Sequence, residues 1–459
     1  MKRIMSERPM WQRKSLVSCK DVFNKKGSVT VFLTSILVAM IMAGFAFVNA
    51  ASSICGASYS DAVLDLAGRS VLAEFDRRLK DEYGIFAYYG LEDKVKADVK
   101  LYASASFNKT LPGEARWFKS GVTDLFRLRL ESLEADLADY SLMDVGVFEK
   151  QVEEYMNFLM VQKGIGFIRN LWKSGENKDK TEGQSEERTL VNQAEINSLP
   201  SGGYAANGID ISAVASSLSS LSDTVFNESA SAFKVNEYIL SHFKYCVGGD
   251  KEKESFFKNE VEYILYGKMS DGDNKNRFKT DFFALREILN LAHIAANPKK
   301  REAIIVMSEP FGPFATAAAA LIWAAWSLAE TENDAKLIME GKNVAFWKTD
   351  DTWALTLKNA VSARSEKDEK NVITGVNVRA KPRSKSVSPS SGAGQSYADY
   401  LRIFLYFEKR ETKLLRTMDL IQLNLRGSYY SDFLIKEHYT GFRLTAFVSG
   451  KKFAYEQKY

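Results

Sequence analysis

The stretch SVTVFLTSILVAMIMAGFAFVNAASSICGASYS, residues 28–60, contains no Asp, Glu, Lys or Arg. Residues 29–48 within it give about the length that a helix needs to cross a hydrocarbon core of roughly 30 Å. Eleven of these twenty residues are Leu, Ile, Phe or Val. At roughly −0.3 to −0.6 kcal/mol each, they favour insertion by about 3 to 6 kcal/mol. The sequence therefore predicts a transmembrane helix over residues 28–51 that contacts the lipid bilayer through residues 29–48.

The charges on the two sides of this segment differ sharply. Residues 1–27 carry eight Lys or Arg against only Glu7 and Asp21, whereas Asp61 and Asp65 follow the segment. Positive residues stay in the cytoplasm. The prediction is a single-pass cell-membrane protein with a cytoplasmic N-terminus and an extracytoplasmic C-terminal domain.

The segment has three other interpretations. A cleaved secretory signal would end near 48–50, but the apolar run is longer than the usual 7–15 residues. A lipoprotein anchor at Cys55 would need a small residue before it, where the chain has Ile54. A prepilin-type leader would be cut between Gly27 and Ser28, although Phe32 stands where pilin precursors usually carry Glu. Cleavage at Gly27–Ser28 and a permanently uncut anchor both stay open.

The composition excludes some classes of protein. With 459 residues, 46% apolar and 12% aromatic residues, the chain is long and apolar enough for two or three folded domains. The formal charge of +4 comes from the basic N-terminal segment, so we expect no nucleic-acid partner. Cys55 and Cys246 could pair in an oxidising exterior, or both could be unpaired small side chains, which we favour.

A second apolar stretch covers residues 310–329, also without charge. Only five of its residues are Leu, Ile, Phe or Val, so its gain on insertion is about half that of the first. Its flanking charges also have the wrong sign for a second span. We predict a buried helix whose alanines allow close packing.

The remaining pattern predicts an α+β fold, mainly α, in which the long N-terminal helix continues into a helical exterior domain with a small antiparallel sheet. The apolar spacing of Leu64, Ala67, Val71, Phe75 and Leu79 predicts that continuation, with a stop at Gly84. The expected regions are a leader (1–27), a transmembrane helix (28–51), a proximal helical region with one strand (52–173), a flexible linker (174–208), a helical core region (209–363), a flexible loop (364–395) and a C-terminal helix and hairpin packing on the core (396–459).

Several shorter elements are also predicted. Alternation over residues 126–131 predicts a strand that pairs with a late hairpin, 441–448 and 452–459. Ser396 and Asp399 form a capping box at the start of a helix that runs to Gly427.

The chain is poor in catalytic signals. His242, His293 and His438 are scattered, and no metalloprotease, P-loop, dinucleotide or nucleophile-elbow motif occurs. We expect satisfied structural histidines, no catalytic or metal-binding residues, no cofactor and no small-molecule substrate. Asp271–Asn276 departs from the calcium-loop pattern, and we predict a solvated turn.

Two further groups of side chains are explained by ordinary structural roles. The basic run from Arg379 to Lys385 suggests a solvated loop, or less readily a contact with anionic wall polymer. Trp323 and Trp326, three residues apart, fit a helix core better than a sugar-binding platform.

Four stretches together resemble a family of uncharacterised membrane-anchored proteins of clostridia-type bacteria. They are KGSVTVF (26–32), FFKNEVEYILYGK (256–268), QSYADYLRI (395–403) and RTMDLIQLN (416–424). The resemblance implies association with tight-adherence (Tad) pilus loci and a layout similar to TadE- and TadG-like pseudopilins. It carries no catalytic residues.

We therefore expect a non-enzymatic anchored exterior protein that is a pseudopilin-like or accessory component of a Tad-like pilus or surface assembly system, with other assembly proteins as partners. The alternatives are a stand-alone anchored protein that binds wall polymer or a host ligand, and an unrecognised wall-acting hydrolase.

Overall fold

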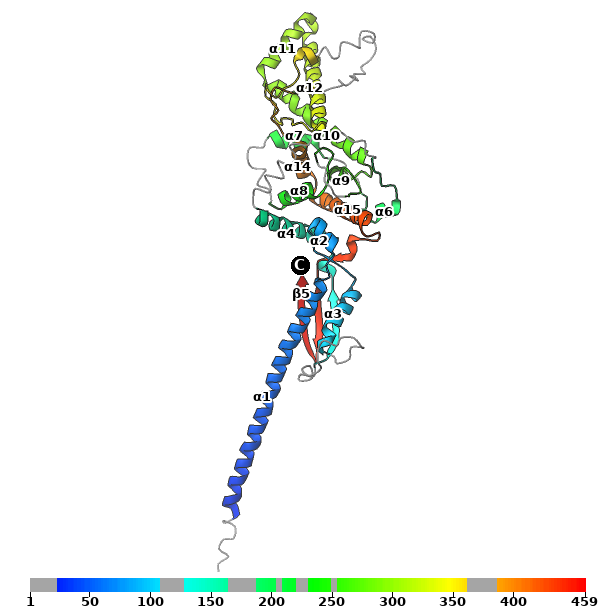
Figure 1. Cartoon of the computed structure of the whole chain (residues 1–459). Coiled ribbons are helices and arrows are strands. Elements are labelled where there is room, and N and C mark those ends of the chain that lie inside the picture. The colour runs from blue at the N-terminus through cyan, green and yellow to red at the C-terminus, as the bar shows by residue number, and fades with distance from the viewer. Residues whose placement is uncertain are drawn as a thin grey trace, which may run out of the picture. The chain divides into compact units, whose positions relative to one another are not determined.

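The computed structural model describes residues 23–107, 128–163, 187–203, 209–219, 230–248, 254–360 and 386–459, which form two compact units (Figure 1). The fold is mainly helical with a small antiparallel sheet, as predicted. The described helices are α1 (Phe23–Leu72), α2 (Arg77–Tyr83), α3 (Glu92–Phe107), α4 (Val145–Lys163), α6 (Gln193–Asn197), α7 (Ile211–Ser219), α8 (Ala230–His242), α9 (Glu260–Tyr266), α10 (Asp271–Ala296), α11 (Pro298–Ser308), α12 (Ala315–Met339), α14 (Tyr397–Phe407) and α15 (Arg410–Ser428). The strands are β1 (Tyr88–Tyr89), β2 (Leu130–Asp136), β3 (His438–Tyr439), β4 (Gly441–Val448) and β5 (Lys451–Lys458), and short 3₁₀ turns lie at Ala138–Tyr140 (η1), Glu309–Phe314 (η3) and Ile435–Glu437 (η4).

Unit 1 is built on α1, an uninterrupted helix of 50 residues. Residues 29–55 are exposed, and the buried positions begin at Gly56 and continue with Ser60, Leu64, Ala67 and Val71. This spacing is the helical stripe that the sequence predicts. The section from Val29 to Leu72 is long and apolar enough to cross a membrane.

The predicted continuation of α1 beyond Val71 is wrong in its length. The helix ends at Leu72, and Asp76 starts the separate helix α2 by accepting a 2.9 Å hydrogen bond from the backbone N–H of Leu79. A short carboxylate that binds the backbone in this way competes with helix continuation. Gly84 does end α2, in the left-handed conformation.

The sheet of unit 1 has the strand order β2-β4-β5, so the early strand pairs with the late hairpin as predicted. Ser449 and Gly450 both have positive φ at the tight turn between β4 and β5, as such hairpins require. The early strand begins at Leu130 rather than 126, and residues 126–127 lie outside the described part of the chain. On α1, Ser53 accepts hydrogen bonds from Lys451 Nζ, and Asp61 accepts one from Tyr455.

Unit 2 has a helical core in which α9 packs against α10, α14 and α15, and α8 against α4 and α14. The predicted single helix from Ser396 to Gly427 is two helices, because Glu408 and Lys409 are extended between α14 and α15. The capping box of Ser396 and Asp399 is present.

The two predicted flexible segments are partly incorporated into this core. Residues 187–203 of the expected linker include α6 and the buried side chains of Leu190 and Leu199. At the end of the expected 364–395 loop, Val387 N–H donates to Asn333, and Gln395 pairs with Val344. Buried apolar side chains and paired backbone groups order these polar-looking segments.

The predicted burial of residues 310–329 is wrong. These residues form η3 and the first part of α12, where Phe314 and Leu321 are 74% and 72% exposed. Helix α12 packs against α10 and α11. Pro298–Met339 is the second segment that is long and apolar enough to cross a membrane.

Candidate functional site

Unit 2 contains two clusters of buried charged and hydrogen-bonding side chains. The first is the α9 cluster, formed by Glu260, Glu262, Tyr263, Tyr397, Arg416, Asp419 and Asn424. Its members come from the three stretches 256–268, 395–403 and 416–424, which the fold brings together. The residue patterns of these stretches do not predict that they meet.

Glu260 and Glu262 hold the segment that follows α8. Glu260 Oε2 accepts a 2.7 Å bond from the backbone N–H of Lys244, and its Oε1 accepts a 2.6 Å bond from Asn424. Glu262 Oε1 accepts from the backbone N–H of Cys246 (2.9 Å) and from the Tyr397 hydroxyl (2.6 Å). Burial raises the pKa of Glu262 to about 7, although these two hydrogen bonds favour its ionised form.

Arg416 and Asp419 connect α15 to the other end of α9. The Nη1 of Arg416, fully buried, donates to the carbonyl oxygens of Ile264 (2.9 Å) and Leu265 (2.7 Å). Asp419 accepts a 2.9 Å bond from the Tyr263 hydroxyl, and burial raises its pKa to about 6. The arrangement satisfies the carbonyl groups that a helix end leaves unpaired.

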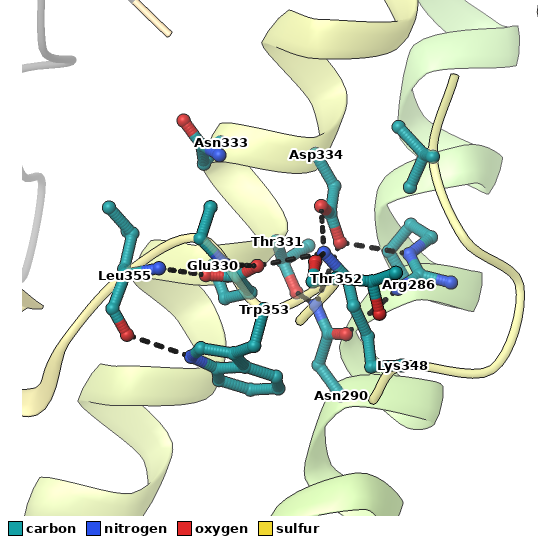
Figure 2. Close-up of polar contacts among 12 residues, drawn as sticks. Arg286, Asn290, Glu330, Thr331, Asn333, Asp334, Lys348, Thr352, Trp353 and Leu355 are labelled. Atoms are coloured by element: carbon teal, nitrogen blue, oxygen red, sulfur yellow. Dashed lines mark hydrogen bonds and ion pairs between the residues drawn. The ribbon is translucent and has the colours of Figure 1, made fainter. Parts of the chain in front are cut away.

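The second site is the charge cluster of Arg286, Glu330, Asp334 and Lys348 (Figure 2). Arg286 Nε lies 3.0 Å from Asp334 Oδ2, and Lys348 Nζ lies 2.7 Å from both Glu330 Oε1 and Asp334 Oδ1. The exposed fraction of each of these four side chains is at most 2%. Two cations therefore balance two anions out of contact with water.

The charge cluster also ties the surrounding backbone together (Figure 2). Glu330 accepts hydrogen bonds from the N–H groups of Ala354 and Leu355, each at 2.9 Å. Arg286 Nη1 donates to Phe346 O at 2.8 Å, and its Nη2 donates to Asn290. These bonds fasten α10 and α12 to the chain around residues 346–355. Buried and mutually paired, the four charged side chains hold these segments of the core together.

The three histidines have structural surroundings. The His242 ring stacks on Tyr238, and its Nδ1 lies 2.9 Å from Ser241 Oγ. His293 stacks on Trp353, where burial lowers its pKa. Its buried Nε2 has no hydrogen-bond partner among the described residues, so the prediction of satisfied histidines is wrong at this position. Nδ1 of His438 lies 2.8 Å from the carbonyl oxygen of Leu434.

The other predicted residues have varied outcomes. Gly27 and Ser28 lie in the first turns of α1. Cys55, in unit 1, is exposed, and Cys246, in unit 2, is half-buried. That the two do not pair stays a prediction. Trp326 is a core residue, as expected, whereas the basic run from 379 to 385 lies outside the described residues.

The predicted solvated turn at 271–276 is wrong. Asp271 is 1% exposed and begins α10, and its Oδ1 accepts backbone N–H bonds from Lys258 and Asn259. The acidic residues that resemble a calcium loop serve instead at a helix start. In the described ranges no group of three or more His, Cys, Asp or Glu side chains is placed to hold a metal ion.

The charge cluster is not among the features that the sequence predicts. One signal was present: Glu330 and Asp334 are four residues apart on one helical face, as are Arg286 and Asn290. Burial of those faces, which depends on contacts distant in the sequence, was not predictable from this spacing.

Comparison with known proteins places most of unit 2 in one family. Residues 182–450 match the family described as "Family of unknown function (DUF5702)". A search of curated proteins gave no match, and a search of solved structures gave none either. The family match covers more than half of the 459 residues and both buried clusters, so the chain belongs to this family of unknown function.

Proposed function

We propose that this protein is a non-enzymatic, membrane-anchored exterior protein that serves as a pseudopilin-like or accessory component of a Tad-like pilus or surface assembly system. The observation that carries the proposal is the continuity of α1, which is exposed and apolar over residues 29–48 and has a buried stripe from Ser60 to Val71. One rigid helix thus serves both as a membrane segment and as part of a folded unit.

The hydrogen bonding of the buried acids supports a non-enzymatic role. Glu260, Glu330 and Asp419 all accept bonds from backbone N–H groups. A general acid or base has to reach a substrate proton. Carboxylates that hold the protein's own backbone in a dry core fit a structural role better.

The sequence around the start of α1 favours an accessory component over a shaft subunit. Phe32 occupies the position of the Glu that pilin-like subunits use to meet the N-terminal amine of a neighbour. An apolar side chain cannot form that ion pair. An accessory that shares the helical layout without the inter-subunit charge pair fits this residue.

Gene deletion followed by complementation tests the proposal. Deletion should abolish surface pili and adhesion, and the wild-type gene should restore both. A variant with Leu37→Arg and Ile41→Arg should not restore them, because two central Arg cost about 5 to 7 kcal/mol on insertion and offset the apolar gain. The matched control is Leu91→Arg, at an exposed site outside the span, which should restore both. Intact pili in the deletion strain would contradict the proposal.

Mass spectrometry of the mature N-terminus refines the assignment. A chain that begins at Ser28 supports pseudopilin-like processing after Gly27. A chain that begins at Met1 supports an uncut accessory anchor, and one that begins near Ala51 contradicts anchoring by α1.

A further inference from the structure

A second apolar feature of the molecule is the hairpin made by α11, η3 and α12. Figure 1 shows α11 and α12 side by side, in agreement with their extensive contacts. From Ala303 to Ala329 the only ionisable residue is Glu309. We call residues 303–329 the apolar hairpin.

The apolar hairpin exposes large side chains from each of its parts. At its tip, Phe311 and Phe314 flank Gly312, whose φ of 52° reverses the chain. The exposed set also includes Ile305 and Val306 on α11 and Leu321 on α12. Soluble surfaces seldom gather so many large apolar side chains in one place.

The distribution of these side chains indicates that lipid, rather than a partner protein, covers the apolar hairpin. Between Ala315 and Ala329 the only polar residues are Thr316 and Ser327, so this part of α12 has no polar face to turn toward water. One face of this stretch is already covered by the chain itself, where Trp326 and Ser327 are buried. A partner protein's groove would cover one further face, whereas a hydrocarbon medium covers all the apolar faces that remain. These 15 residues rise about 22 Å at 1.5 Å each, less than the roughly 30 Å of a full bilayer core.

Basic residues at the base of the apolar hairpin match the negative charge of anionic lipid head groups. Lys299 and Arg301 are exposed in the first turn of α11, about two to three turns before the tip. Basic residues at that depth attract anionic lipid head groups. At the base of α12, the charge cluster begins with Glu330 and fixes the helix to the core.

We propose that the apolar hairpin inserts into one leaflet of a bilayer that contains anionic lipids, as a second membrane contact besides α1. The tip enters the hydrocarbon layer, and Lys299 and Arg301 remain among the head groups. This proposal does not depend on the pilus assignment. An anchored protein with such a contact can hold its exterior domain against its own membrane or against a second one.

The experiment uses the full chain held in lipid nanodiscs by α1. With Cys19, Cys55 and Cys246 replaced by Ser, a single Phe314→Cys or Asp273→Cys site is labelled with a fluorophore. Asp273 is an exposed residue in the first turn of α10 and serves as the control position. Nitroxide-bearing lipids quench a label that enters the bilayer. They are placed in the nanodisc in one arm and in added vesicles in the other, with phosphatidylcholine and about 30% phosphatidylglycerol in both.

The label at position 314 should be quenched at least fivefold more than the label at 273 in one of the two arms, and the arm identifies the membrane. Phe311→Ser should reduce this quenching severalfold, whereas Trp347→Ser, which removes another half-exposed aromatic, should leave it within twofold. Glu309→Gln should increase quenching because it removes the one charge near the tip. Equal quenching at 314 and 273 in both arms overturns the proposal, as does a Phe311→Ser variant that is quenched like its parent.

Discussion

The hydroxyl of Tyr397 donates a 2.6 Å hydrogen bond to Oε1 of Glu262, although 135 residues separate the two in the chain. This bond joins α14 to α9 inside the core. Its acceptor is a carboxyl group with no exposed surface, and burial raises its pKa from 4.5 to about 7. The α9 cluster therefore contains a group whose charge state responds to pH near neutrality.

Glu262 predicts a pH dependence of stability. Between about pH 4.5 and 7, the folded protein retains a proton on Glu262 that the unfolded chain has released. The free energy of unfolding therefore falls as the pH rises through this window, by at most about 3 kcal/mol from this group. Glu262→Gln should flatten the dependence and stabilise the protein at pH 8 relative to wild type, as measured by urea unfolding at several pH values.

Two controls sharpen this measurement. Glu411→Gln changes an exposed Glu on α15 and should leave the pH dependence within experimental error of wild type. Asp281 and Asp419, whose pKa values burial raises to about 6, act in the same direction, so some dependence remains in every variant. If Glu262→Gln keeps the full wild-type dependence, the assignment to Glu262 is wrong.

Position 267 should tolerate only Gly, because the Arg416 side chain fills the space beside it. Gly267 ends α9 with φ of +63°, and a Cβ placed on it would lie 2.7 Å from Arg416 Nε. Gly267→Ala should lower the free energy of unfolding by about 3 kcal/mol or more, because the strain of the left-handed conformation adds to displacement of a buried guanidinium.

Gly202 is the matched control for this substitution. It has nearly the same φ, +64°, with nothing within 4 Å of an added Cβ. Gly202→Ala should cost only about 1 kcal/mol. Equal losses in the two variants would show that Arg416 does not constrain position 267.

The charge cluster predicts that two Lys→Met substitutions lower the free energy of unfolding by very different amounts. Lys348→Met leaves Glu330 and Asp334 buried with one cation between them, and should destabilise by about 3 to 5 kcal/mol. Lys342→Met removes an exposed Lys that pairs with Glu340, and should cost less than about 1 kcal/mol.

A double substitution tests the charge balance directly. Lys348→Met with Glu330→Gln restores one cation and one anion, Arg286 and Asp334, and should recover at least about 1 kcal/mol relative to Lys348→Met alone. A double variant that is less stable than the single one would contradict this account of charge balance.

The sequence predicts the local elements and the pairing of the early strand with the late hairpin, but not the contacts between helices. The β4–β5 hairpin, the capping box at Ser396 and the apolar length of α1 are determined by residues close together in the chain. The α9 cluster is different, because Glu262 meets Tyr397 only through the packing of α14 on α9.

The two main errors have physical causes of the same kind. The weak insertion gain and the flanking charges of the run 310–329 predict a buried helix rather than a second span, yet its exposure depends on which elements cover it. The departure of residues 271–276 from the calcium-loop pattern predicts a solvated turn at Asp271, yet its carboxylate accepts backbone N–H bonds from a segment about a dozen residues away. Neither the cover of the 310–329 helix nor the donors to Asp271 can be read from the neighbouring residues in the sequence.

The central claim is that α1 anchors the chain in the membrane with its C-terminal part outside the cell. Protease added to intact cells tests this most directly, with an epitope tag placed after Tyr459 and a cytoplasmic protein as the control. The account predicts that the tag is lost from intact cells while the cytoplasmic control survives. A tag that survives in intact cells and is lost only after lysis would contradict it.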